Sequence, residues 1–185
     1  MRRAAPSGST VHFTIEPPQN TSLYPFDTKG IALSPDGTMV VFAAEDVHSK
    51  ASLYVRHLAT TQTTVLAGTE DASYPFWSPD SRQLGFFAKK LHRTDVAGGP
   101  IVTICDAPSG RGGTWSRNGV IVFAPALAGE LYRVSAAGGR PERVTRRRSE
   151  GNRQRWPWFL PDGKRFSTSS TQTSWRARSM ARCRS

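Results

Sequence analysis

A four-residue turn signature recurs four times along this 185-residue chain and limits what it can fold into. The copies lie 44, 38 and 44 residues apart and read Ser34-Pro35-Asp36-Gly37, Ser78-Pro79-Asp80-Ser81, Ser116-Arg117-Asn118-Gly119 and Leu160-Pro161-Asp162-Gly163. A second landmark keeps the same phase, with starts 38 and 40 residues apart, in Leu53-Tyr54-Val55-Arg56, Leu91-His92-Arg93-Thr94 and Leu131-Tyr132-Arg133-Val134. Two landmarks in phase predict a tandem structural repeat of about 40 residues.

The turn residues have a structural explanation. Proline presets φ at the first central position, Ser and Asp side chains bond the local backbone, and glycine supplies a positive φ. One active site needs no copy in every repeat, so we interpret these residues as anchors of the fold and not as catalytic or calcium-binding groups. The predicted anchors are Ser34, Pro35, Asp36, Gly37, Ser78, Pro79, Asp80, Asn118, Gly119, Pro161, Asp162 and Gly163.

Short β-branched or aromatic runs flank the turns and predict strands. They precede the turns at 74–77, 113–115 and 156–159, and follow them at 39–43, 84–88 and 120–124. The second landmark supplies a third strand, and paired glycines at 98–99 and 138–139 allow a reversal into a fourth. Four strands in each repeat predict an all-β chain built as a partial β-propeller of four-stranded blades. The alternating segment 11–16 predicts one further strand before the first full repeat.

These residues resemble the TolB-type, WD-repeat-like propeller family. More narrowly, Tyr74-Pro75-Phe76-Trp77-Ser78-Pro79-Asp80-Ser81 and Leu131-Tyr132-Arg133-Val134-Ser135-Ala136-Ala137-Gly138-Gly139 are similar to the propeller that follows many bacterial serine/threonine kinase domains. The resemblance covers residues 11–166 and implies a sensor or binding module on the periplasmic or extracellular side of a membrane kinase. The chain has no kinase motif of its own, neither a Gly-rich loop with its strand lysine nor His-Arg-Asp or Asp-Phe-Gly.

The repeat stops abruptly after Phe166. Residues 167–185 contain no Val, Ile, Leu or Phe and are rich in Arg, Ser and Thr, which predicts a disordered tail. We expect a disordered N-terminus at 1–10, an incomplete propeller of about three and a half blades at 11–166, and the tail at 167–185. We hypothesise that the reading frame shifts or the gene is interrupted near Phe166, and the other two frames of the coding DNA test this. Open blade ends predict a need for the remaining blades or for self-association.

Composition excludes some function classes. No run of about 18 apolar residues and no secretory leader occurs in the sequence, so it predicts neither a membrane span nor an export signal. The net charge is +11, but residues 140–185 hold 13 basic and three acidic groups, which leaves the body of the chain nearly neutral. Nucleic-acid binding is therefore disfavoured and stays only as an alternative.

Residues for catalysis, cofactors or metals are not predicted. The four histidines, His12, His48, His57 and His92, include no pair at metal-ligand spacing, and no Gly-x-Ser-x-Gly elbow occurs. The segment Gly110-Arg111-Gly112-Gly113 lacks the Lys-Ser/Thr ending of a phosphate loop and predicts a connection between blades. Cys105 lies in an apolar run and is expected to be a buried, inert thiol.

Trp77 and Trp115 recur just before the turns and are expected to pack between blades. Ligand binding is the second interpretation of the whole aromatic set, Trp77, Trp115, Trp156 and Trp158. The sequence thus predicts a non-catalytic module that binds an unidentified protein or small ligand. The first alternative is a propeller piece of a serine peptidase or another propeller hydrolase. The second is a basic nucleic-acid-binding protein.

Overall fold

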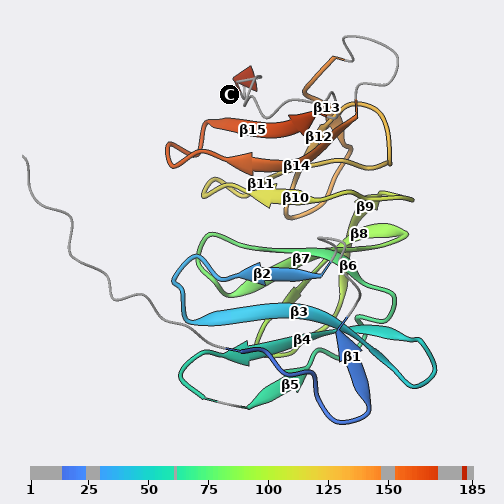
Figure 1. The fold of residues 1–185 in the computed structure, drawn as a ribbon. Helices are drawn as coiled ribbons and strands as arrows, with labels where there is room; N and C mark the ends of the chain where they lie inside the picture. Colours follow the sequence, from blue (N-terminus) through green and yellow to red (C-terminus); the bar gives the residue numbers. More distant parts are fainter. Residues whose placement is uncertain (1–13, 24–29, 61, 147–152, 171–180, 183–185) are drawn as a thin grey trace, which may run out of the picture.

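A computed structural model describes residues 14–23, 30–60, 62–146, 153–170 and 181–182. These residues form four antiparallel sheets and no helix (Figure 1). The first sheet contains β1 (Thr21–Leu23), β2 (Ile31–Leu33), β3 (Met39–Asp46), β4 (Ala51–His57) and β5 (Thr63–Val65). The second contains β6 (Ser73–Trp77), β7 (Gln83–Ala88), β8 (Lys90–Asp95) and β9 (Val102–Asp106). The third contains β10 (Gly113–Trp115), β11 (Val120–Phe123), β12 (Tyr132–Ser135) and β13 (Glu142–Arg143), and the fourth β14 (Gln154–Phe159), β15 (Arg165–Ser170) and β16 (Ala181–Arg182).

The second, third and fourth sheets are meanders in which consecutive strands pair. The first sheet differs because β1 and β2 both pair with β3, β1 at residues 44–46 and β2 at residues 40–42. The strands flanking the turns lie where the sequence predicted them. The third and fourth strands of the repeat are confirmed as well, for example at β8 and β9.

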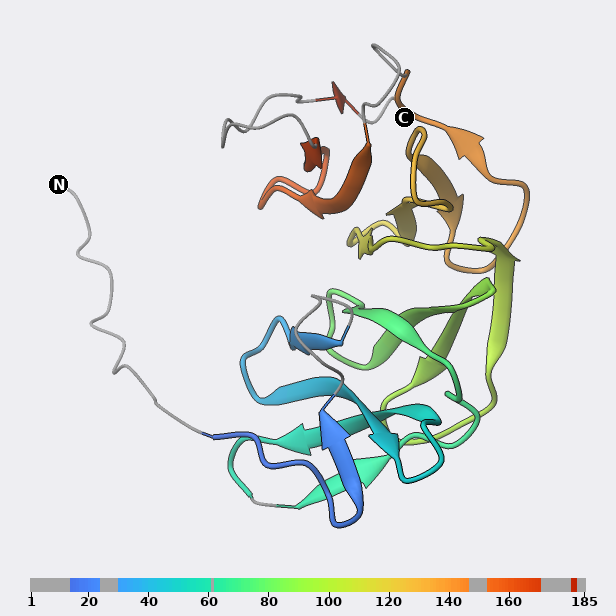
Figure 2. The same ribbon diagram turned by 45° about the vertical axis from the view of Figure 1, so that its right-hand side comes forward.

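The sheets stack face to face in chain order, and β2, β6, β10 and β14 lie side by side. Figure 2 shows the four sheets following an arc, as the blades of a propeller do. Three apolar cores fill the spaces between successive sheets. Their most deeply buried side chains include Leu53, Leu84 and Phe86 in the first core, Phe87, Ile121 and Phe123 in the second, and Val122, Leu131 and Phe166 in the third. Each fully buried side chain of this size contributes about 1.5–3 kcal/mol, so the stack is held mainly by these cores.

The turn signature forms the hairpins between the first two strands of each repeat. In the second hairpin, for example, the N–H of Ser78 donates to the carbonyl of Gln83, and the N–H of Ser81 donates back to the carbonyl of Ser78. The last residue of every turn has a positive φ: 72° at Gly37, 61° at Ser81, 73° at Gly119 and 62° at Gly163. Glycine adopts this conformation without steric cost, which explains its recurrence.

A close approach of backbone and ring explains two other glycines. Phe76 of β6 lies between Gly85 of β7 and Gly113 of the third sheet. A Cβ atom added at Gly85 would lie 2.2 Å from the ring of Phe76, and one added at Gly113 would lie 2.6 Å from it. Both positions therefore need glycine so that the ring can pack between the second and third sheets.

Strand structure extends beyond the predicted boundary at Phe166. β15 continues to Ser170, with Ser167 opposite Trp158 and Ser169 opposite Arg155, and β16 at residues 181–182 pairs with β15 inside the predicted tail. A strand without large apolar residues is possible here because hydroxyl groups bond the neighbouring strand. The side chains of Thr168 and Ser169 donate to the carbonyl of Arg155, which a bulge in β14 leaves available.

The strand predicted at 11–16 is not found where the structure describes that segment. Residues 14–16 form no strand, and the chain first turns at Pro18, whose carbonyl accepts the N–H and the hydroxyl of Thr21. Two consecutive prolines cannot donate ladder hydrogen bonds, and among the described residues the first strand begins after them, at Thr21. Residues 11–13, the predicted disordered segment 1–10, and residues 171–180 and 183–185 of the predicted tail lie outside the described residues.

Candidate functional site

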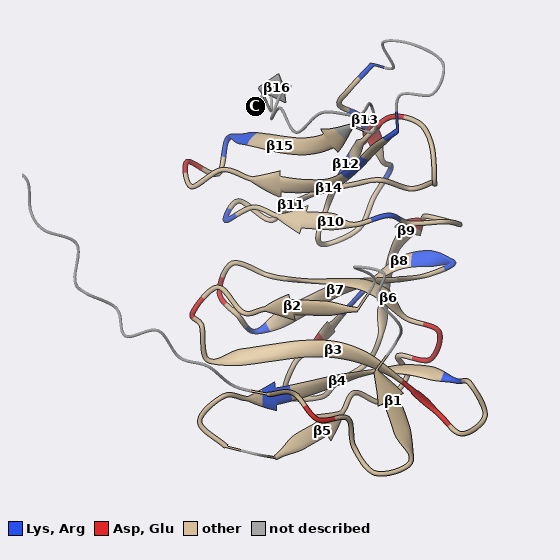
Figure 3. Ribbon diagram, viewed as in Figure 1, with Lys and Arg blue, Asp and Glu red and all other residues tan. Residues whose placement is uncertain are grey.

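The recurring turn residues lie at one end of the stack of sheets, and Figure 3 shows acidic turns at the left-hand ends of the strands. Their carboxylates hold the turns. Asp36 accepts the hydroxyl of Ser34 at 2.6 Å and the N–H of Thr38 at 2.9 Å. Asp80 accepts the hydroxyl of Ser78 at 2.6 Å in the same way. The other predicted anchors lie in the same four turns: Pro35, Gly37, Pro79, Asn118, Gly119, Pro161 and Gly163.

The fourth turn replaces the serine with an arginine partner. Asp162 accepts the N–H groups of Lys164 and Arg165 at 3.0 Å and Nε of Arg165 at 2.7 Å. These bonds, with the side chain of Arg165 first, lower the pKa of Asp162 to about 2. The Ser34 hydroxyl is the largest cause that lowers the pKa of Asp36 to about 2. Carboxyl groups with such a low pKa stay ionised near neutral pH and are poor general acids.

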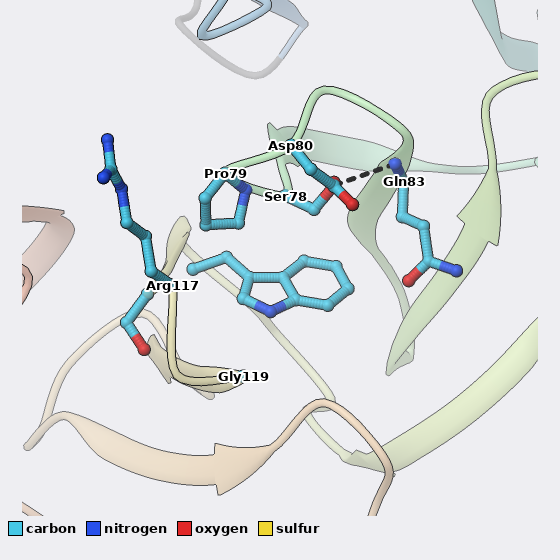
Figure 4. A pocket seen from close by; sticks show the side chains of 8 residues that line it. Ser78, Pro79, Asp80, Gln83, Arg117 and Gly119 are labelled. Atoms are coloured by element: carbon cyan, nitrogen blue, oxygen red, sulfur yellow. Dashed lines mark hydrogen bonds between the residues drawn. The ribbon is translucent and has the colours of Figure 1, made fainter.

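A cavity of about 340 Å³ lies at this end of the molecule between the second and third sheets; we name it the turn pocket. Figure 4 shows Ser78, Pro79, Asp80 and Gln83 on one wall, with Arg117 and Gly119 on the other. The pocket also contains the half-buried indole of Trp115 and the side chain of Ser116.

The turn pocket combines groups suited to binding. The rings of Trp115 and Pro79 offer apolar surface, Asp80 offers an ionised carboxylate, and Gln83 offers an amide. The Ser78 hydroxyl lowers the pKa of Asp80, so this charge persists near neutral pH. The lining includes neither histidine nor cysteine. The arrangement can hold a ligand by stacking and by hydrogen bonds.

A second cavity of about 260 Å³ lies at the opposite end, between the first and second sheets. Arg111 covers the ring of Tyr74 there, with its Cζ atom 5.5 Å from the ring centroid, and Glu45 and Asp71 contribute carboxylates. Tyr74 has a φ of 51°, and Trp156, in the equivalent bulge of β14, has a φ of 48°. Such a backbone is uncommon for an aromatic residue. The N–H of Trp156 donates to the carbonyl of Arg111, so residues of both bulges contact Arg111.

The structure separates the four tryptophans. Trp77 is buried between the first two sheets, and its indole N–H donates to the carbonyl of Ala32 at 3.0 Å. Trp115 lines the turn pocket, whereas Trp156 is partly exposed with Arg155 stacked on its ring at 5.7 Å. Trp158 is 70% exposed on the outward face of the fourth sheet. Only Trp115 of the four lines one of the two cavities described.

The other candidate residues have structural surroundings. Cys105 is half-buried, and burial raises the pKa of its thiol to about 11, with the charge of Asp106 adding to the effect. In the part of the chain that the structure describes, no three His, Cys, Asp or Glu residues gather where they could hold a metal ion. The same residues form no helix of the length and hydropathy needed to cross a membrane. His12 and Cys183 lie outside the described residues.

Sequence reasoning missed three pocket residues and one turn contact. Gln83 and Arg111 lack a repeat signal, although Arg111 lies in the glycine-rich segment that was interpreted only as a connection. Arg117 stands at the proline position of the third turn and was not singled out. Ser81 replaces a glycine of the signature, and its hydroxyl accepts the N–H of Asp36 at 3.2 Å. That contact joins the first two turns, and the departure from glycine was its only signal in the sequence.

Comparison with known proteins identifies the fold. A protein assigned as TolB from Agrobacterium tumefaciens matches with a TM-score of 0.66 and 16% identity, covering 80% of this chain and 56% of that one. A calcium-binding protein, regucalcin, from the same organism matches at 0.56 and 20%, covering 79% and 54%. Dipeptidyl peptidase 4 of Porphyromonas gingivalis matches at 0.52 and 10%, covering 76% and 28%. No protein-family profile and no curated protein matches the sequence.

The chain therefore has a TolB-like β-propeller fold, and the predicted fold class is confirmed. It spans just over half the length of the first two of these proteins. At these identities the similarity establishes the architecture alone.

Proposed function

We propose that this chain is a non-catalytic propeller module that binds a short peptide segment in the turn pocket. One observation carries the proposal: Trp115 is left half-buried in a cavity, whereas Trp77, in the same register of the preceding repeat, is buried and hydrogen-bonded. A partly open indole beside a proline ring is a surface on which apolar side chains stack.

The carboxylate of Asp80 favours a segment that also carries hydrogen-bond donors. Asp80 is ionised and already held by Ser78, so its position is fixed before a ligand arrives. A carboxylate can accept several hydrogen bonds, and an amine or guanidinium on the ligand would add a charge-assisted one. The matching segment has an apolar residue against Trp115 and a basic residue within reach of Asp80.

Selection of peptides from a random display library on the full chain tests this proposal. We expect enriched peptides to pair an apolar with a basic residue and to bind the Trp115→Ala variant at least 10-fold more weakly. Trp115→Phe keeps an aromatic face and should retain most of the affinity. Val47→Ala, at an exposed site away from the turn pocket, is the matched control. Peptides that bind Trp115→Ala as tightly as the parent chain would refute the assignment.

The resemblance to kinase-linked propellers supports a narrower role as the sensor part of a serine/threonine kinase. Residues 74–81 and 131–139 carry that resemblance. Sequencing of the neighbouring DNA tests it, because a kinase reading frame should lie directly upstream. An unrelated upstream gene would remove the support.

A second candidate role is the propeller of a serine peptidase, favoured by the structural likeness to dipeptidyl peptidase 4. This role requires a hydrolase domain encoded in frame with the propeller. Labelling of the native gene product with a fluorophosphonate probe would support the peptidase role, whereas an unlabelled product with intact peptide binding would favour the binding module.

A further inference from the structure

Each sheet has two faces, one on the side where the stack begins and one on the side where it ends. Trp77 pairs with Leu84 and faces the first sheet, and Phe159 pairs with Phe166 and faces the third. The residue before each of these points the opposite way, because side chains alternate along a strand. Phe76 accordingly packs toward the third sheet, and Trp158 occupies the same register on the outward face of the fourth.

Trp158 occupies the strand position of Phe76, but no described sheet packs over it. Phe76 is 8% exposed, whereas Trp158 is 70% exposed. The residue paired beside each ring is small, Gly85 in the second sheet and Ser167 in the fourth. The outward face of the fourth sheet therefore presents the aromatic side chain that elsewhere in the chain packs against the next sheet.

The outward face of the first sheet presents the complementary apolar surface. Ile31 pairs with Phe42 and Leu33 pairs with Val40, and these four residues share the face that the other sheets turn toward the preceding one. Ile31 is 59% and Leu33 55% exposed, beside Phe42 and Val40, which are buried. Thr14 lies beside β4, where Arg56 donates to its carbonyl at 3.1 Å.

Charge also differs between the two ends. Residues 30–72 contain five acidic and two basic residues, a net charge of −3. Residues 153–170 contain four basic and one acidic residue, a net charge of +3. Opposite charges steer one end of the chain toward the other end of a second copy and oppose contacts between like ends.

We propose that two copies of this chain associate head to tail, with the fourth sheet of each packed on the first sheet of the other. Each contact brings two sheets face to face, as successive sheets lie within the chain, and buries Trp158 against the exposed side chains of Ile31 and Leu33. In a closed pair the two contacts form a ring of eight sheets, whereas a heterologous interface that does not close continues as a filament. The proposal does not depend on the turn pocket, which lies between the second and third sheets.

Sedimentation of the full chain over a range of concentrations tests the proposal. We expect a concentration-dependent species of twice the 20.3 kDa monomer. Trp158→Ser and Leu33→Lys should each raise the dissociation constant more than 10-fold, because each removes or charges an exposed apolar contact. Val47→Ser, an exposed apolar site in the β3–β4 turn, should leave it unchanged.

Mixing separates head-to-tail association from other modes. An equimolar mixture of the Trp158→Ser and Leu33→Lys variants contains one undamaged interface in each mixed pair, so dimers should reappear at concentrations where either variant alone is monomeric. Circular dichroism of both variants checks that the β fold is kept. A parent chain that stays monomeric, or a parent dimer that both variants retain, would overturn the proposal. Failure of the mixture to restore dimers would overturn the head-to-tail geometry.

Discussion

Replacement of Gly85 by alanine tests the packing between the second and third sheets. The new Cβ atom would lie 2.2 and 2.4 Å from ring atoms of Phe76, well inside the 3.5–4.0 Å of an ordinary carbon contact. The ring cannot simply move away, because Gly113 already approaches it from the other side. We expect Gly85→Ala to lower the free energy of unfolding by about 1–3 kcal/mol, the usual cost of overpacking.

A double-mutant cycle with Phe76→Leu separates this clash from a general effect of alanine in a strand. Phe76→Leu alone should cost about 1 kcal/mol, and the smaller side chain leaves room for the added methyl group. The double variant should therefore be more stable than the sum of the single effects by about 1 kcal/mol or more.

Urea unfolding followed by tryptophan fluorescence measures these differences, at one fixed protein concentration because association changes apparent stability. Gly99→Ala is the matched control, since its Cβ would find only Asp95 at 3.6 Å and its φ lies outside the left-handed region. It should change the stability by less than about 0.5 kcal/mol. Additive effects of Gly85→Ala and Phe76→Leu would refute the reasoning.

Three further predictions follow from single contacts. Trp77→Phe should lower the free energy of unfolding by about 1–3 kcal/mol, measured in urea, because it leaves the Ala32 carbonyl without its indole donor. The pKa of Asp162 is about 2 in the folded chain, so its stabilising contribution is present above pH 4 and is lost as the pH falls toward 2. Asp162→Asn should flatten the pH dependence of the urea midpoint over that range, and an unchanged slope would contradict the assigned bonds. The Cys105 thiol, with a pKa of about 11, should react with iodoacetamide far more slowly in the native chain than in urea, as followed by peptide mass spectrometry.

The blade pattern could be predicted from the sequence because it depends on local chemistry. Pro79 and Asp80 form a turn through their own dihedral preference and hydrogen bonds, and the apolar residues that follow at 84–88 can only bury themselves in a stacked sheet. Because such signals need no knowledge of the distant chain, the strands flanking the turns were found at their predicted places.

The pockets and the last strands could not be predicted because they depend on contacts between repeats. Arg111 meets Tyr74 only after the second and third sheets have packed. Thr168 can remain in a strand because a bulge in β14 frees the carbonyl of Arg155 to accept its hydroxyl. Composition alone therefore misjudged residues 167–170 as tail.

Departures from the repeat identify the surfaces available for binding. A residue that recurs at the repeat period, such as Asp36 or Asp80, is fixed by the geometry of its own turn. The third turn lacks the Pro-Asp pair. The N–H of Ser116 donates to the carbonyl of Val120, four residues later, whereas in the other turns the equivalent bond spans five residues, so this hairpin is one residue shorter. Arg117 and Gly119 of this shorter turn lie on one side of the Trp115 indole. Pro79 and Asp80 of the second turn lie on the other side. These two unlike turns face one another across the turn pocket, and the half-buried indole of Trp115 lies between them.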